Sequence, residues 1–186
     1  MRHSYEQWQL FIDASKTSLK VVLLHNGNKL PYIPVAYAPS TKGTYTTMNN
    51  ILIEVDYKKY RWEVCGDFNI IAVLLGLHGG YTKYSCFLCE GDCRARVSHY
   101  SRKHWPHGQS STPGMKNVLH KPSIKTSKVL PPPLHIKLGL MKNFVKALNV
   151  KGPALMYLCG KCPRLIYEKV KAGVFICPQI RQLFKD

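Results

Sequence analysis

The sequence predicts an α/β fold built around a mixed sheet. Short β-prone segments lie between residues 8 and 38, apolar residues at helical spacing follow from Thr46, and a short β-prone segment that ends in an acid comes next. With 186 residues, of which 45% are hydrophobic, the chain is able to bury a sizeable core.

Two antiparallel strands are expected first. The segment from Trp8 to Asp13 is apolar on both sides apart from Gln9, which indicates a central strand that is buried on both faces. The second strand runs from Leu19 to His25. Asn26-Gly27 follows it directly and predicts a tight type I′ hairpin, because that turn needs a positive φ at both central positions.

A third strand and a helix follow. The strand spans about Leu30 to Ala38, and since Pro31 and Pro34 cannot donate hydrogen bonds to a ladder, it should lie outermost, at the edge of the sheet. The helix begins near Thr46, where apolar residues are spaced three or four apart at Met48, Ile51, Leu52 and Val55.

A fourth strand is expected to end in an acid. Trp62 to Cys65 is β-prone, Gly66 permits a sharp exit, Asp67 follows it, and Asn69 to Gly76 indicates a buried helix. A strand, helix and strand in this order run parallel, so placing the fourth strand beside the first brings Asp13 and Asp67 to one edge of the sheet. This is the ribonuclease H topology.

The rest of the chain divides into an insertion and a helical region. Residues 78–133 are rich in Gly, Pro, Ser, Thr, Lys and His and lack periodicity, and loops of that length are functional, metal-stapled or disordered. Helical spacing returns from Leu134 to Asn149. We therefore expect the first part of a core over 1–77, a basic Cys/His insertion over 78–133, and a C-terminal helical region over 134–186 that is truncated.

The charge of the chain is concentrated in its second half. Residues 1–93 hold nine Lys and Arg against eight Asp and Glu, whereas residues 94–186 hold eighteen against two. The usual partner of such a basic segment is a phosphate backbone, so DNA is the expected partner. Solvated surface is the plain alternative. The expected contacts are Arg94, Arg96, Arg102, Lys103, Lys116, Lys121, Lys125 and Lys128, interleaved with Tyr100 and Trp105.

Membrane and secreted classes are disfavoured. The longest apolar run, from Ile70 to Leu77, is too short to cross a bilayer, and we find no basic amphipathic stretch rich in Trp or Phe. The seven cysteines are an odd number and include two Cys-x2-Cys pairs, which favours metal binding in a reducing compartment over disulfides. We expect an intracellular protein, with the nucleus and the cytoplasm both left open.

Asp13 and Asp67 are the candidate catalytic residues. Carboxylate oxygens suit Mg²⁺, and two of them at one sheet edge would hold the ion that phosphodiester chemistry needs. The alternative for either residue is a turn or a helix cap. A third carboxylate is normally required, and neither Glu168 nor Asp186 is well placed for it.

Cys86 and Cys89 are the candidate ligands of a structural zinc ion, which would order the insertion. His99 follows at a finger-like spacing, and His135 is a further candidate. Other possible ligands are Cys93, His104, His107 and His120. A site of four thiolates with Cys159 and Cys162 is a rival arrangement, and two reduced cysteines in a loop are the alternative without metal.

Three blocks of the chain resemble a known family. LFIDASKTSLKVVLL, CGDFNIIAVLLGLHGGYTKYSCFLC and PPLHIKLGLMKNFVKAL, in this order, are similar to the core of eukaryotic cut-and-paste DDE transposases with a Cys/His insertion. The similarity is nearest to CACTA-like and related groups and to uncharacterised transposon-derived proteins of invertebrates. It extends over essentially the whole chain.

The resemblance implies a ribonuclease H-like fold in which three acids bind Mg²⁺ and DNA strands are cut and joined. Asp13 matches the first acid and Asp67 the second. Cys86, Cys89 and His135 match the metal-type block, in which Pro132 replaces a frequent Asp.

The third acid of the family is expected beyond residue 186. The resemblance therefore implies a transposase-derived fragment that lacks strand-transfer activity by itself. The alternative is a non-catalytic, zinc-stapled basic module that binds nucleic acid, and a chain that does not fold stably alone is a third possibility.

Overall fold

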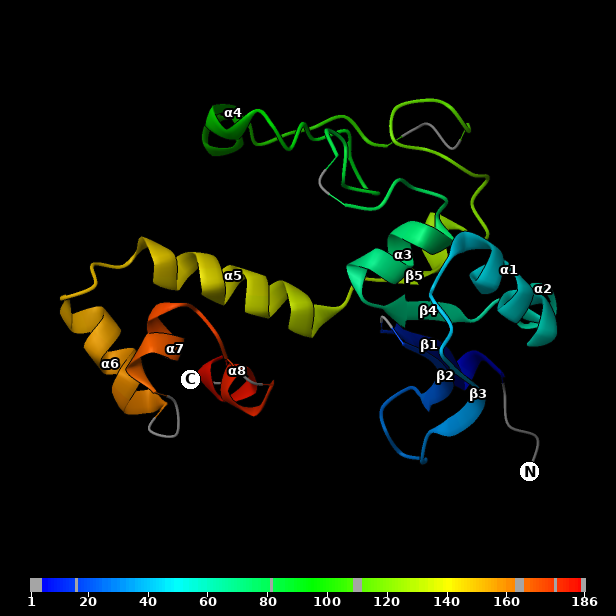
Figure 1. Cartoon of the computed structure of the whole chain (residues 1–186), viewed down its shortest axis with the longest axis horizontal. Helices are drawn as coiled ribbons and strands as arrows, with labels where there is room; N and C mark the ends of the chain where they lie inside the picture. Colours follow the sequence, from blue (N-terminus) through cyan, green and yellow to red (C-terminus); the bar gives the residue numbers. More distant parts are fainter. Residues whose placement is uncertain are drawn as a thin grey trace. The chain divides into compact units, whose positions relative to one another are not determined.

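The computed structural model describes residues 5–15, 17–80, 82–108, 112–162, 166–175 and 177–184, with only the backbone described at Tyr100 and Cys177. It divides the chain into two compact units, Met1–Pro131 and Pro132–Asp186. The first unit combines a sheet with helices, and the second is helical (Figure 1). No described helix is long and apolar enough to cross a membrane.

The first unit contains a five-stranded mixed sheet with the order β3-β2-β1-β4-β5. Its strands are β1 (Trp8–Ala14), β2 (Ser18–His25), β3 (Ile33–Pro39), β4 (Glu63–Gly66) and β5 (Val129–Leu130). β2 is antiparallel to β1 and β3, whereas β4 is parallel to both β1 and β5. The predicted mixed α/β architecture is confirmed, as are the central position of the first strand and the edge position of the third.

The predicted tight hairpin after β2 is wrong. Asn28 donates its N–H to the carbonyl of His25 at 3.0 Å, and Gly27 has a φ of 85°, but Asn26 has no positive φ, which a type I′ turn would require. The strand that follows begins only at Ile33. Pro31 explains the delay, because it cannot donate to the ladder with β2.

One face of the sheet carries the main core. Apolar side chains of α1 (Tyr45–Glu54) and α3 (Phe68–Leu74) pack there against β1, β2 and β4. The most deeply buried strand residues are Leu10, Ile12, Leu19, Val21 and Val64. The expectation that the first strand is buried on both faces is wrong, since Phe11 is half-buried and Asp13 is exposed.

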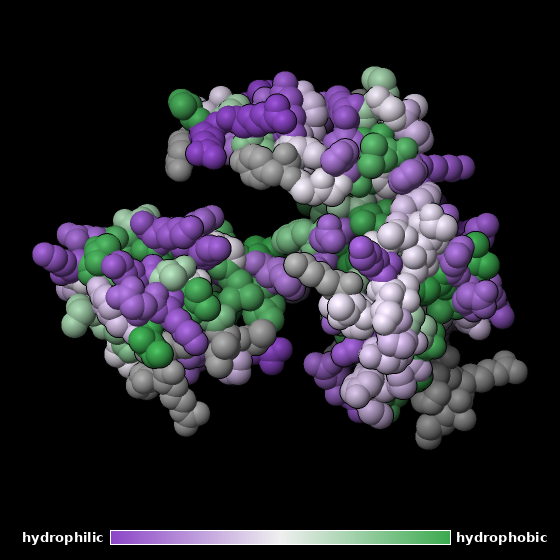
Figure 2. All heavy atoms as spheres, viewed as in Figure 1, coloured by the Kyte–Doolittle hydropathy of each residue, from purple (hydrophilic) through white to green (hydrophobic). Residues whose placement is uncertain are grey.

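The insertion ends inside this core. Ile124 and Val129 belong to the main core, and Leu77 forms a β-bridge with Val118. The short helices are η1 (Tyr5–Gln7), α2 (Tyr57–Tyr60), α4 (Arg96–Ser101) and η2 (Thr126–Lys128). Residues 118–130 are thus part of the packed first unit. Hydrophilic residues cover much of the remaining insertion on the face seen in Figure 2.

The second unit consists of α5 (Pro133–Ala147), α6 (Pro153–Lys161), α7 (Tyr167–Lys171) and α8 (Cys177–Leu183). Its helices surround a separate core made of Met141, Val145, Leu155, Leu158, Cys162, Val170, Phe175 and Ile180. Pro133 and Pro153 each occupy the first turn of a helix, where a missing N–H costs nothing. The helix expected over 134–149 is therefore present as α5.

Candidate functional site

Asp13 and Asp67 lie at the same end of two neighbouring parallel strands, where Asp13 is the last residue but one of β1 and Asp67 directly follows β4. Ile12 of β1 is the register partner of Gly66 of β4, so the two aspartates are the next residue along each strand. Parallel neighbours lie about 4.8 Å apart, and side chains at equivalent positions point to the same face. Both carboxylates therefore start from adjacent positions, on the face opposite the buried side chain of Ile12.

The two carboxylates differ in their present contacts. Asp67 is the N-cap of α3, and its Oδ1 accepts a hydrogen bond from the N–H of Ile70 at 2.7 Å. This is the capping role that stood as the alternative to catalysis. Asp13 is exposed and lies opposite Lys20 in the ladder with β2. Neither carboxylate forms an ion pair with a residue that the structure describes, so Asp13 and the second oxygen of Asp67 remain available to a cation.

Gly66 sets the close approach of β4 to β1. A Cβ at this position would lie 2.7 Å from the carbonyl oxygen of Ile12, which is shorter than van der Waals contact allows. The sequence suggested Gly66 for a sharp exit from the strand. In the structure, Gly66 allows β4 to lie close to β1, because a side chain at this position would push Asp67 away from Asp13.

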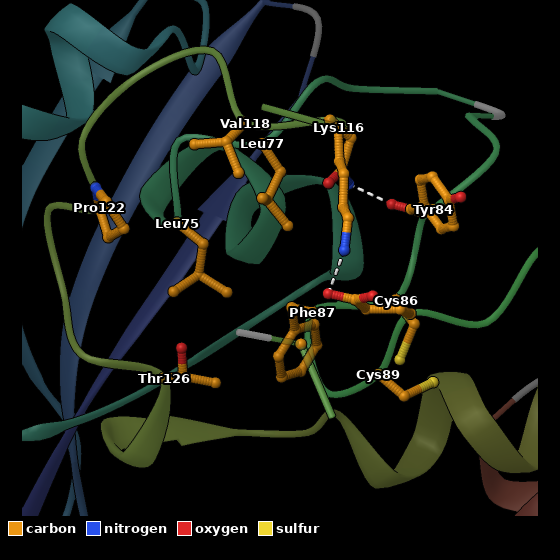
Figure 3. A pocket seen from close by; sticks show the side chains of 13 residues that line it. Leu75, Leu77, Tyr84, Cys86, Phe87, Cys89, Lys116, Val118, Pro122 and Thr126 are labelled. Carbon is orange, nitrogen blue, oxygen red and sulfur yellow. Dashed lines mark hydrogen bonds and ion pairs between the residues drawn. The ribbon is translucent and has the colours of Figure 1, made fainter. Parts of the chain in front are cut away.

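Cys86 and Cys89 form a compact turn with their sulfur atoms side by side (Figure 3). The Sγ of Cys86 accepts a hydrogen bond from the N–H of Leu88 at 3.4 Å. Burial raises the pKa of the Cys89 thiol, and its interaction with Cys86 adds to this, whereas a backbone hydrogen bond from Gly91 acts in the opposite direction. N–H groups directed at sulfur stabilise thiolates, which are the form that binds metal.

A second chain segment holds this turn in place. Cys89 forms an antiparallel bridge with His107. The N–H of Glu90 donates to the carbonyl of Pro106 at 2.8 Å, and the N–H of Gly108 donates to the carbonyl of Leu88 at 3.1 Å. An isolated bridge and two backbone hydrogen bonds therefore pair residues 88–90 with residues 106–108, which places His107 next to Cys89.

Of the other possible zinc ligands, His107 is paired with Cys89, and the Cys93 thiol is close enough to raise the pKa of Cys89 electrostatically, whereas His99 has other contacts. The Nε2 of His99 lies 2.7 Å from the carbonyl oxygen of Asp92, and its ring packs edge-on against Trp105. His135 lies in α5 of the second unit. Within the described ranges, no three His, Cys, Asp or Glu side chains are close enough together to hold a metal ion. Of the rival pair, Cys162 is buried in the helical core, and Cys159 is half-buried and packs against that core.

The eight predicted phosphate contacts separate into distinct groups. Arg94, Arg96 and Lys103 are exposed, and the guanidinium of Arg102 stacks over Trp105 at 4.5 Å. We call these four residues the arginine arm. Lys116 differs, because it forms an ion pair with Glu90 and lies over Tyr84 at 5.6 Å (Figure 3).

Lys121, Lys125 and Lys128 form a third group. They line a hollow together with Lys58 and Arg61, which sequence reasoning missed. The signal that would have found these two is the run from Tyr57 to Trp62, in which three cations alternate closely with three aromatic residues.

Comparison with known families gives two matches. A model described as a domain of unknown function (DUF8703) matches residues 1–124, and one described as a domain of unknown function (DUF8704) matches residues 133–186. No curated protein and no solved structure gives a significant match. The boundary between the two matched segments agrees with the division at Pro131 and Pro132. Because the first model covers more than half of the 186 residues, the chain belongs to the DUF8703 family.

Proposed function

We propose that the first unit is a transposase-derived, ribonuclease H-like domain that binds a divalent metal ion at the carboxyl edge of its sheet and binds DNA through its basic insertion. The observation that carries this proposal is the strand arrangement. Three antiparallel strands precede a parallel β4 that pairs with β1, so that Asp13, near the end of β1, and Asp67, directly after β4, occupy equivalent positions on adjacent strands.

The two aspartates suit a hard cation such as Mg²⁺. Asp67 is held in one orientation by the N–H of Ile70, and Asp13 projects from an exposed position on the neighbouring strand. A bound ion would supply Lewis-acid activation of water for phosphodiester cleavage. No third carboxylate joins them among the described residues. We therefore expect metal binding at this edge without efficient strand transfer by this chain.

Metal binding is tested by titrating the protein with Mn²⁺, used as a paramagnetic probe for Mg²⁺. The wild-type chain should bind one ion at the carboxyl edge and release it to excess Mg²⁺. The double variant Asp13→Asn/Asp67→Asn should lose this binding at least tenfold while retaining its fold. Equal Mn²⁺ affinity in the variant would overturn the metal role. The pair Glu54→Gln/Asp56→Asn, which removes two other acids, is the matched control.

DNA binding is tested through the arginine arm. Neutralising Arg94, Arg96, Arg102 and Lys103 should weaken duplex binding, and the dependence of the logarithm of affinity on the logarithm of salt concentration should become shallower by about 0.9 per lost contact. A salt dependence that stays the same would show that the arm does not contact phosphates. Because Asp13 and Asp67 are not involved, their Asn variants should bind duplex DNA as well as the wild type or better.

A second candidate function is a zinc-stapled nucleic-acid module without catalysis. The hairpin around Cys86 and Cys89 favours it, because paired thiols with N–H···S bonds fit two zinc ligands. Metal analysis of protein purified without chelator should find zinc in the wild type and little in Cys86→Ser/Cys89→Ser. The control Cys65→Ser/Cys159→Ser should keep the metal. Zinc content near zero in the wild type would remove this candidate.

A further inference from the structure

We propose that a groove at the amino-terminal ends of β1, β4 and β5 binds a single strand of nucleic acid. The groove consists of two adjoining hollows that share Lys58, Arg61 and Lys128. We call the hollow that also contains Lys121 and Lys125 the phosphate hollow. We call the hollow that also contains Tyr5, Tyr60 and Trp62 the aromatic hollow. Neither uses the aspartates or the arginine arm.

The phosphate hollow has a strongly anion-attracting lining. Five cations and no acid border it, and they come from two chain segments more than fifty residues apart. These cations are Lys58, Arg61, Lys121, Lys125 and Lys128. None of them forms an ion pair with any residue in the described part of the chain. Unpaired cations that surround a hollow create a field that a row of phosphates would neutralise.

The backbone around the phosphate hollow is well anchored. The hydroxyl of Tyr45 donates to the carbonyl of Lys121 at 2.6 Å, and the N–H of Ser123 bonds to the carbonyl of Leu74 at 2.9 Å. Ile124 is buried in the main core. In the other chain segment that lines the hollow, the Nε of Arg61 donates to the carbonyl of Lys58 at 3.3 Å. The cations are therefore carried by fixed backbone, which lowers the cost of ordering them around a ligand.

A polar atom in the same hollow also lacks a partner. The hydroxyl oxygen of Ser123 is buried and forms no hydrogen bond with the described residues. A buried hydroxyl without a partner costs free energy. A rotation of the Ser123 side chain toward the hollow would let a ligand oxygen, or a water that accompanies the ligand, satisfy it. This observation is independent of the charge of the lysines and favours a polar occupant.

The aromatic hollow explains why the partner is a single strand. Tyr60 and Trp62 stack at 4.6 Å between ring centroids, and Tyr5, which is 51% exposed, lies 6.2 Å from Tyr60. Unpaired bases stack on exposed aromatic rings, whereas the bases of a duplex are already stacked on one another. Glu6 and Glu63 also line this hollow. These two acids disfavour phosphates in the aromatic hollow. The sugar-phosphate backbone of the bound strand should therefore lie along the phosphate hollow, and its bases should stack in the aromatic hollow.

The groove is separate from the proposed metal site. Trp8, Glu63 and Val129 begin the three parallel strands, whereas Asp13 and Asp67 lie at the opposite ends of β1 and β4. β1 has seven residues, which corresponds to roughly 20 Å at about 3.3 Å per residue. Binding in the groove therefore does not depend on the metal chemistry proposed above.

Fluorescence anisotropy with a labelled oligothymidylate and a duplex of equal length tests this inference on the whole chain. Lys58→Glu/Lys125→Glu should bind the single strand at least about tenfold more weakly, and the salt dependence should become shallower by about 1.4 for two lost contacts. The control Lys29→Glu/Lys42→Glu changes the net charge by the same amount at exposed positions outside the groove. Equal losses in the two variants would overturn the proposal.

Tyr5→Ala tests the base-stacking part. It should weaken single-strand binding about tenfold and leave duplex binding unchanged. A duplex that competes as well as the single strand in the wild type would exclude this partner. Asp13→Asn/Asp67→Asn should leave single-strand affinity unaltered, so that a failure of the groove and a failure of the metal site are read from different variants.

Discussion

The carboxylate of Asp67 has a structural role that must be separated from metal binding. Its Oδ1 caps α3 through the N–H of Ile70. Asn caps a helix about as well as Asp, whereas Ala does not. We expect Asp67→Ala to lower the free energy of unfolding by about 1 kcal/mol and Asp67→Asn to leave it nearly unchanged, as measured by urea titration. A stability loss as large in Asp67→Asn would show that the negative charge, and not the cap, stabilises the native state.

Tyr57, which is buried, and Cys65, which is half-buried, predict a loss of stability at alkaline pH. Burial raises the pKa of Tyr57 from 10.0 to about 12. Burial, with the negative charge of Glu63, raises the pKa of the Cys65 thiol from 9.0 to about 11. Both groups bind their protons more tightly in the native state. Their contribution to stability is therefore complete below pH 9 and is lost as the pH rises from 9 to 12.

The measurement is the free energy of unfolding as a function of pH. Tyr57→Phe should be less stable at neutral pH, because the hydroxyl donates to the carbonyl of Trp62 at 3.0 Å. It should also lose less stability than the wild type between pH 10 and 12. Tyr37→Phe, at a position that is 64% exposed, is the control. Parallel curves for the wild type and Tyr57→Phe would contradict the assignment.

At the level of elements, periodicity predicted the strands and the long helices. The apolar run from Trp8 predicted β1, although not its one-sided burial, and the helical spacing from Met48 predicted α1; both segments pack against the same core. β5 has only two residues and no pattern of its own. The prediction that Asp13 and Asp67 lie at the same end of adjacent strands needed only topology. The groove could not be predicted in this way, because Lys58 and Lys125 come together only through tertiary packing.

Gly76, which follows α3, contacts residues 119 and 120 near the end of the insertion. It has a φ of 68°, and its carbonyl accepts hydrogen bonds from the N–H groups of Leu119 and His120 at 2.8 and 3.0 Å. A Cβ here would overlap the carbonyl of His120, whereas one at Gly80, which has a φ of 87°, would meet no atom within 4 Å. Gly80→Ala should therefore show only the cost of a left-handed backbone, about 1 kcal/mol, and Gly76→Ala a larger loss. Urea unfolding followed by tryptophan fluorescence measures both, and equal losses would contradict the close contact.

For the whole molecule, the uneven charge and the two cores divide the chain in different places. The acid-poor segment begins after Asp92, within the first unit, and continues through the second. The cores instead separate at Pro131 and Pro132. The charge pattern therefore does not follow the folding units. The apolar residues, and not the charged ones, therefore determine where the chain divides into units.

The separate cores predict that the two units respond to different mutations. Ile180 is fully buried in the helical core, so Ile180→Ala should cost that unit about 2–5 kcal/mol. The three tryptophans, Trp8, Trp62 and Trp105, all lie in the first unit. In this variant, circular dichroism should therefore show loss of helix at a lower urea concentration than in the wild type. The tryptophan fluorescence transition, which reports on the first unit, should keep its urea midpoint.

Val64→Ala, in the main core, is the reciprocal variant and should move the fluorescence midpoint instead. If Ile180→Ala shifts the fluorescence midpoint by as much as Val64→Ala does, the units unfold as one. In that case the division of the chain into two independently stabilised cores would be incorrect.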